Sequence, residues 1–96
     1  MKKTIKSIIV DDMDHCLVCG RAYPEIHHCI FGTSNRKKSD QYGLIVPLCA
    51  EHHRGDSGPH KNRSFDLYLK RAAQIAFELH CGNRDKFIEE FGKSYL

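Results

Sequence analysis

The clearest hydrophobic pattern lies in the last third of the chain and has the period of an α-helix. Apolar side chains recur every three or four residues there, and polar side chains occupy the opposite face. The pattern predicts one long helix with Ser64 as its N-cap and Gly82 near its C-terminus. The apolar stripe consists of Phe65, Leu69, Ala72, Ala76 and Leu79, widened by Tyr68 and Ile75, and the polar face carries Asp66, Lys70, Arg71, Gln74 and Glu78.

A second, shorter helix is expected after this one. Asn83 can cap it and Gly92 would end it. Its apolar positions would be Phe87, Ile88 and Phe91. Residues 64–92 are therefore predicted to form a C-terminal helical part.

The first two thirds of the chain contain short apolar runs separated by polar stretches. A helix could begin at Cys49 or Ala50 and must end by Gly55 or Gly58. The polar stretches 32–43 and 55–63 are interpreted as loops, because neither has an apolar period. Three segments are predicted as strands or extended chain, namely residues 4–10, 24–30 and 44–48.

Composition and length indicate that this protein needs a stabilising cross-link. A chain of 96 residues is enough for one domain, residues 1–96, but its core is small, so a metal or disulfides are expected to stabilise it. The odd number of cysteines, five, and the lack of a secretory signal argue against a disulfide framework and for a cytoplasmic protein. No apolar run approaches the ~20 residues that span a bilayer, so a membrane is not an expected partner.

Two pairs of metal-ligand residues carry the strongest chemical signal. Cys16 and Cys19 are separated by two residues and precede a glycine, as in a zinc knuckle, and Cys49 and His52 repeat that spacing. Two such pairs from separate segments can supply the four ligands of a tetrahedral Zn²⁺. The alternative is two buried thiols and an unrelated pair near a helix start. We expect a structural zinc held by Cys16, Cys19, Cys49 and His52.

Four further histidines indicate a second site. His27 and His28 are adjacent in the extended segment, His53 follows a predicted zinc ligand, and His60 lies shortly beyond it. Each alone would be interpreted as a surface or packing histidine, but together they suggest a second metal or catalytic site. Strand alternation would point His27 and His28 apart, so both can serve one site only if the backbone bends there. The remaining cysteines, Cys29 and Cys81, are expected to be buried apolar residues.

The order of these residues resembles the HNH, or ββα-metal, endonucleases. A Cys-x2-Cys pair, an extended segment ending in His-His, and a hydrophobic strand running into Leu-Cys-x2-His-His follow one another over residues 14–62. With the long helix that follows, the chain looks most like the phage recombination-associated branch of this family. The resemblance implies an α+β fold with a small zinc-stabilised, treble-clef-like ββα-metal core over 14–62 and C-terminal helices.

The resemblance also implies roles for the second group of histidines. His27, His53 and His60 would hold a catalytic divalent metal, which could be Mg²⁺, Mn²⁺, Ni²⁺ or Zn²⁺, and His28 would be the general base that activates water. The implied activity is hydrolysis of phosphodiester bonds in nucleic acid, with DNA as the expected substrate, in a bacterial or phage-infected host cell. The asparagine that gives the family its middle letter is absent, because Gly43 and Leu44 occupy its region. Asn35 or Asp40 could substitute for it, or both could be plain loop residues.

The distribution of positive charge fits a nucleic-acid partner. Net charge is only +3, but the middle third of the chain is its basic part. No recognition helix is evident, so weak sequence preference is expected. The candidate phosphate contacts are Arg36, Lys37, Lys38, Arg54, Lys61 and Arg63.

Two other functions fit the same residues. The framework could be a non-catalytic zinc-binding module that binds nucleic acid or protein. It could also be a phage accessory nuclease that needs a host recombination protein as its partner. A substitution at His28 separates the first alternative from a nuclease, because only a nuclease would lose an activity.

Overall fold

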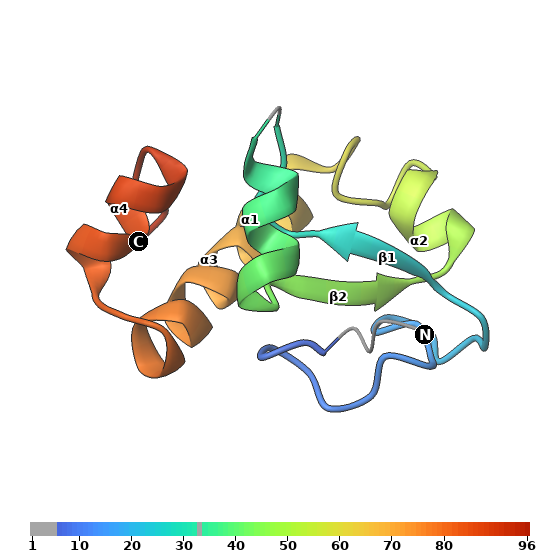
Figure 1. The fold of residues 1–96 in the computed structure, drawn as a ribbon. Helices are drawn as coiled ribbons and strands as arrows, with labels where there is room; N and C mark the ends of the chain where they lie inside the picture. The colour runs from blue at the N-terminus through green and yellow to red at the C-terminus, as the bar shows by residue number, and fades with distance from the viewer. Residues whose placement is uncertain (1–5, 33) are drawn as a thin grey trace.

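A two-stranded antiparallel sheet pairs the segment that carries His27 and His28 with the segment that runs into Cys49 (Figure 1). The computed structural model describes residues 6–32 and 34–96. Strand β1 (Glu25–His28) pairs with β2 (Ile45–Leu48), so that Glu25 lies opposite Leu48 and His28 lies opposite Ile45. Every residue of β2 is buried. The two strands predicted over 24–30 and 44–48 are therefore confirmed with shorter bounds, and the described residues form an α+β structure.

Helix α1 (Asn35–Tyr42) connects the two strands, where the sequence predicted a loop over residues 32–43. The prediction was wrong because the helix is almost entirely polar and offers no apolar period, although Arg, Lys and Gln all favour helices. Its one fully buried side chain is Ser39, whose hydroxyl donates a hydrogen bond of 2.6 Å to the carbonyl of Ile30. Tyr42 packs on the ring of Phe77, with 5.0 Å between centroids.

Helix α2 (Ala50–Arg54) follows β2 directly and ends at Gly55, as predicted. Its N-cap is Cys49, which has an extended backbone and leads straight out of the strand. The loop that follows, residues 55–62, connects α2 to the next helix and contains His60. This arrangement brings β1, β2 and α2 together at one end of the molecule (Figure 1).

Helix α3 (Arg63–His80) begins before Ser64, so the predicted N-cap was wrong. Asn62 caps the helix instead, because its side-chain oxygen accepts a hydrogen bond of 3.2 Å from the backbone N–H of Phe65. Both residues are good caps, and only the structure decides which of them ends the preceding loop.

The buried face of α3 is rotated from the predicted stripe. Leu69, Ala73 and Phe77 are buried, whereas Leu79 is 75% exposed. Tyr68 and Ile75, which were also assigned to the stripe, are 64% and 49% exposed. Three residues assigned to the polar face are buried and hydrogen-bonded, which lets polar groups lie in a core. They are Asp66 and Lys70, which pair with each other, and Gln74, whose side-chain oxygen accepts from Tyr95 N at 2.7 Å.

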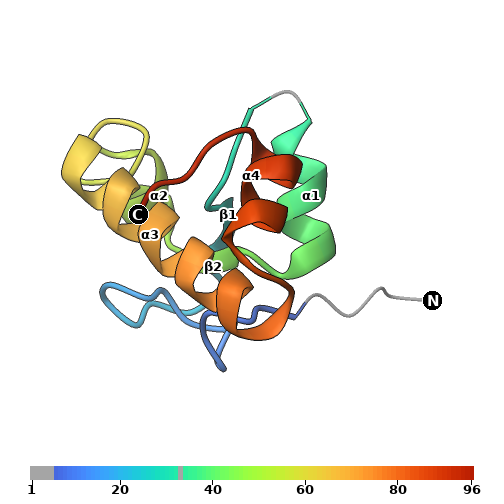
Figure 2. The same ribbon diagram turned by 90° about the vertical axis from the view of Figure 1, so that its left-hand side faces the viewer.

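Helix α4 (Arg84–Phe91) has the cap and the end that the sequence predicted. Asn83 accepts a hydrogen bond of 2.8 Å from Lys86 N, and Gly92 follows the last turn with a φ of 92°. Figure 2 shows α4 between α1 and the second half of α3. The hydrophobic core consists of Cys16, Cys29, Ile30, Leu44, Val46, Leu48, Cys49, Leu69, Ala73, Phe77, Phe87 and Phe91.

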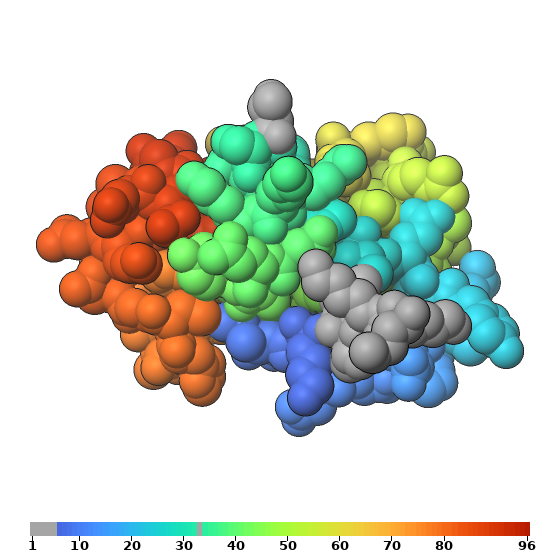
Figure 3. Space-filling view, viewed as in Figure 1, coloured from blue at the N-terminus to red at the C-terminus, as the bar shows by residue number. Residues whose placement is uncertain are grey.

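The N-terminal segment lies along the end of α1 (Figure 3). Residues 6–10 do not form a strand, and residues 4 and 5 of the predicted strand lie outside the described residues. Ile8 N instead donates a hydrogen bond of 2.9 Å to the carbonyl of Gly43. Among residues 6–32 and 34–96, no helix has the length and apolar character that crossing a bilayer requires.

We predict that Gly43→Ala destabilises the fold. Gly43 ends α1 with a φ of 73°, and a Cβ there would lie 2.8 Å from the carbonyl oxygen of Lys6. The left-handed conformation and the clash together should cost about 2 kcal/mol, which lowers Tm by roughly 8–15 °C in a domain of this size. Gly92→Ala is the matched control. Its φ is also positive, at 92°, but a Cβ added there would have no neighbouring atom within 4 Å. Equal melting temperatures for the two variants would contradict the close contact.

Candidate metal centres

Cys16 and Cys19 are presented by a tight turn in the N-terminal segment. Gly20 N donates to the carbonyl of Cys16 at 2.8 Å, and Cys16 N donates to the carbonyl of Arg21 at the same distance. Gly20 adopts a φ of 77°, which a residue with a side chain rarely adopts. The turn is anchored on the sheet, because Leu17 N donates to the carbonyl of Pro47 in β2 at 2.8 Å. The predicted knuckle therefore forms and lies against β2.

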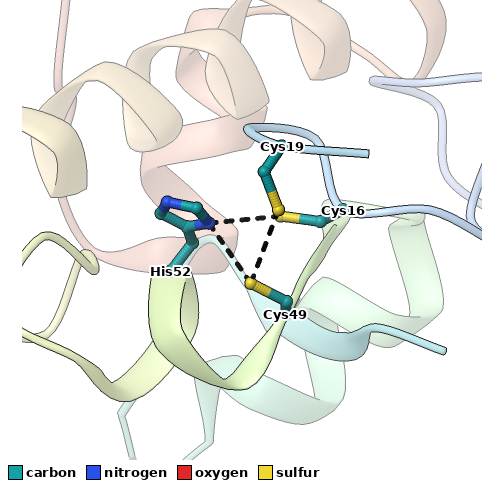
Figure 4. Close-up of side chains that lie close together, drawn as sticks. All are labelled: Cys16, Cys19, Cys49 and His52. Atoms are coloured by element: carbon teal, nitrogen blue, oxygen red, sulfur yellow. Dashed lines mark hydrogen bonds between the residues drawn. The ribbon is translucent and has the colours of Figure 1, made fainter. Parts of the chain in front are cut away.

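The four predicted ligands of the first site converge in one small space (Figure 4). One ligand atom from each of Cys16, Cys19, Cys49 and His52 lies within 4.8 Å of the others. The sulfur of Cys19 is 3.8 Å from that of Cys49, and Nδ1 of His52 is 3.2 Å from Cys49 Sγ and 3.7 Å from Cys16 Sγ. These residues could hold a metal ion.

The surroundings of Cys16 favour its thiolate form, which is the form that binds metals. Burial raises the pKa of this thiol, but hydrogen bonds from the backbone N–H groups of Cys49, Cys19 and Val18 outweigh it, so that the pKa is lowered to about 6. The knuckle and the start of α2 thus supply the donors that stabilise a negative sulfur. Neither Cys29 nor Cys81 belongs to a metal-ligand cluster of the described residues, as expected, but only Cys29 is buried and Cys81 is half-buried.

His27, His53 and His60 form a second cluster from three different elements. His27 comes from β1, His53 from α2 and His60 from the loop after α2, and one nitrogen of each lies within 4.8 Å of the others. The rings are 5.1 to 5.3 Å apart between centroids. The sequence-based grouping of these three residues is therefore reproduced, including His60, which a loop delivers to the cluster.

His27 has a feature that packing alone does not explain. It is 1% exposed, and neither of its ring nitrogens has a hydrogen-bond partner among the described residues. A buried polar group without a partner is costly, and a bound ion or water or a catalytic role is a common reason for one. Burial, together with the charges of His53 and His60, lowers the pKa of His27 to about 3, which keeps its imidazole neutral and able to bind a metal.

Glu25 supports this cluster and was missed by the sequence analysis. Its carboxylate accepts a hydrogen bond of 2.7 Å from Nδ1 of His53 and is also bound by Arg54. The hydrogen bond from His53 lowers the pKa of the Glu25 carboxyl, and the positive charge of Arg54 lowers it further. Metal-ligating histidines almost always donate the N–H of their second nitrogen to a carboxylate, a backbone carbonyl or a water. The available signal was its position two residues before His27, which places both on one face of a strand.

His28 lines the same pocket as the cluster, although strand alternation predicted that it would point away from His27. It is the last residue of β1. The pocket has a volume of about 270 Å³ and is lined by His27, His28, His53, His60, Phe31 and Arg36, with Ile26 at its edge. Both histidines of the pair therefore line one pocket, as a shared site requires.

Of the two residues considered as replacements for the missing asparagine, Asp40 contacts His28. The carboxylate oxygen of Asp40 lies 2.8 Å from Nε2 of His28. Asp40 belongs to α1, the helix that the sequence analysis took for a loop. No hydrogen bond joins Asn35 to His28 in the described part of the chain.

Phe31 and Lys70 pack beside the cluster of histidines, and the sequence did not indicate either of them. The ammonium of Lys70 is 3.9 Å from the centre of the Phe31 ring and is bound by the carboxylate of Asp66. The Phe31 ring in turn lies 4.9 Å from that of His60. This contact connects α3 to the loop that carries His60, and the buried pair of Asp66 and Lys70 adds no net charge there.

Most of the predicted phosphate-binding residues have acidic or carbonyl partners. Lys38 donates to the carbonyl of Glu90 at 2.6 Å, Arg54 is bound by Glu25, Lys61 lies 3.7 Å from Asp56 and Arg63 lies 3.9 Å from Asp66. Arg36 and Lys37, both in α1, have no acidic partner within residues 6–32 and 34–96. Only Arg36 of the six lines the pocket.

Comparisons with known proteins identify no relative. No protein-family model matches the sequence, and neither a curated protein nor a solved structure resembles it significantly. Function must therefore be inferred from the two clusters and the pocket.

We predict that the single substitution Cys49→Ala unfolds the protein. Metal binding at a structural Cys and His site contributes on the order of 10 kcal/mol, which is comparable to the whole stability of a small domain. Far-UV circular dichroism at 37 °C should then show a largely unfolded chain, and a strong chelator should have the same effect on the wild-type protein.

Cys29→Ala is the matched control for this prediction. Cys29 is fully buried like Cys49 but lies outside the cluster, so its loss should cost only about 1–2 kcal/mol of packing. If the two variants melt at the same temperature, Cys49 contributes packing and no metal ligand.

Proposed function

We propose that this protein is a metal-dependent endonuclease of the HNH type, which hydrolyses phosphodiester bonds of nucleic acid, with DNA as the substrate. The observation that carries the proposal is His27, a buried imidazole with two unpartnered nitrogens beside two further histidines in an open pocket. The order β1, β2, α2 supports it, because β1 carries the His-His pair and α2 carries one histidine of each cluster, His52 and His53.

The ion of the first cluster is zinc in this proposal. A tetrahedral zinc with Zn–S bonds of about 2.3 Å places its sulfurs about 3.8 Å apart. Cys19 Sγ and Cys49 Sγ are 3.8 Å apart, and the distances from His52 Nδ1 to two sulfurs are 3.2 and 3.7 Å. Three thiolates and one imidazole are also a ligand set that suits zinc and not the harder ions Mg²⁺ or Ca²⁺.

The second cluster fits a catalytic divalent ion. His27, His53 and His60 are neutral donors and would leave the ion its full charge, and Glu25 holds His53 so that its Nε2 remains available. When bound, the ion would stabilise negative charge on the phosphate and on the leaving oxygen. Three protein ligands leave positions for water or substrate, as catalytic sites require.

The remaining residues of the pocket would handle the substrate. His28 would take a proton from the attacking water, because it lines the pocket and is not one of the three clustered histidines. Arg36 would bind a phosphate oxygen at the pocket rim, and Lys37 on the same helix would add positive charge nearby. Of the six cations proposed from the sequence, this proposal thus retains Arg36 and Lys37.

A non-catalytic zinc-binding module is the competing proposal. It is favoured by the acidic partners of Lys38, Arg54 and Lys61, which leave a smaller basic surface than the sequence suggested. It offers no reason, however, for three histidines in a pocket. An activity assay with a single substitution separates the two proposals.

We predict that His28→Ala abolishes most nuclease activity and leaves the fold and DNA binding intact. A general base typically contributes 10²–10⁴-fold to the rate, so kcat should fall by roughly that factor. The measurement is nicking of supercoiled plasmid and cleavage of single-stranded DNA with Mg²⁺, Mn²⁺, Ni²⁺ or Zn²⁺. DNA affinity is measured by fluorescence polarisation in the absence of a cleavage-supporting ion.

His80→Ala is the control for a histidine outside the pocket, since His80 is an exposed residue at the end of α3. It should cleave like the wild type. A wild-type protein that binds DNA but cleaves none with any of the four ions would favour the binding module, and an active His28→Ala variant would remove His28 from the mechanism.

A further inference from the structure

The contact between His28 and Asp40 is held by the way α1 is fixed to the rest of the protein. Asp40 follows Ser39, the buried residue that hydrogen-bonds to the Ile30 carbonyl, and precedes Tyr42, which packs on Phe77. Gly43 then ends the helix and accepts a hydrogen bond from Ile8 N. The carboxylate is thus placed beside His28 by a helix that is attached at several points.

The chemistry of this contact selects one form of the His28 ring. An ionised carboxylate can only accept hydrogen bonds, so Nε2 of His28 must donate to Asp40 over 2.8 Å. In a neutral imidazole, Nδ1 is then the only nitrogen with a free lone pair. Asp40 therefore determines which nitrogen of His28 can accept a proton.

His53 shows the same arrangement with the opposite nitrogen. Its Nδ1 is bound by Glu25, which leaves Nε2 for the metal cluster. Two carboxylates from different elements thus fix two neighbouring histidines in opposite tautomers. One of these histidines belongs to the proposed metal cluster, and the other is the histidine that would accept the proton of water.

We propose that Asp40 is a positioning residue for His28, which orients the ring and holds its Nε2–H tautomer so that Nδ1 is the atom that accepts a proton from water. This inference rests on the proposed nuclease function. Asp40 itself does not touch the substrate, and its side chain is 51% exposed. A polar contact of such an exposed side chain contributes little to stability, so its loss should change the rate without unfolding the protein.

The first test is kinetic and uses the metal-loaded, full-length chain. Asp40→Ala should lower kcat roughly 10- to 100-fold with an unchanged KM, which is part of the 10²–10⁴-fold effect of a general base. Asp40→Glu should recover part of the loss, because it restores a carboxylate on the same helix face. Asp11→Ala removes the same charge from an exposed position outside the pocket and should have no effect. Unchanged kcat in Asp40→Ala would overturn the assignment.

The second test reads the tautomer directly and does not depend on activity. Nitrogen-15 NMR of the zinc-loaded, histidine-labelled protein should show His28 with its proton on Nε2 and His53 with its proton on Nδ1. In Asp40→Ala the signals of His28 should shift toward a mixture of tautomers, whereas those of His53 should stay unchanged. Identical His28 signals in both proteins would overturn the inference. If the wild type cleaves nothing, the nuclease proposal fails, and this spectrum still decides whether Asp40 holds His28.

Discussion

The convergence of the N-terminal knuckle and the start of α2 on one cluster is the constraint on which the rest of the structure depends. Cys16 and Cys19 come from a segment without helix or strand, and Cys49 and His52 come from the junction of β2 and α2. A two-stranded sheet and a small core give little independent support to such a segment. An ion held by these four side chains would fix the knuckle, the sheet and α2 relative to one another.

The two clusters are mechanically connected through α2. Consecutive residues of a helix project about 100° apart, so His52 can face the first cluster while His53 faces the second. Glu25 and His27 of β1 complete the second cluster from the other side, and the loop after α2 adds His60. Whatever fixes α2 therefore also fixes the geometry of the pocket, which is consistent with the two candidate sites lying so close in the sequence.

The ligand residues were the part of this protein that the sequence could predict. The spacing of Cys16 and Cys19 and of Cys49 and His52 indicates a metal by itself, since few other functions need that pattern. The strands and α2 were predicted for a similar reason, because short apolar runs lead into these residues. Asn83 and Gly92 likewise identified α4 through local hydrogen bonding and backbone conformation, which depend on few neighbours.

The parts that could not be predicted depend on contacts between distant residues. Helix α1 has no apolar stripe that would predict it. The proposed role of Asp40 depends on its contact with His28, which only the folded chain brings about. Asp66 and Lys70 are buried because they pair with each other, whereas a hydrophobicity pattern places each in solvent.

Metal content per chain tests the central claim most directly. Elemental analysis and native mass spectrometry of the purified protein should find one tightly held zinc and a second divalent ion that a mild chelator removes, and His27→Ala should retain only the zinc. A wild-type protein with fewer than two bound ions after reconstitution, or a His27→Ala variant that still holds both, would contradict the account.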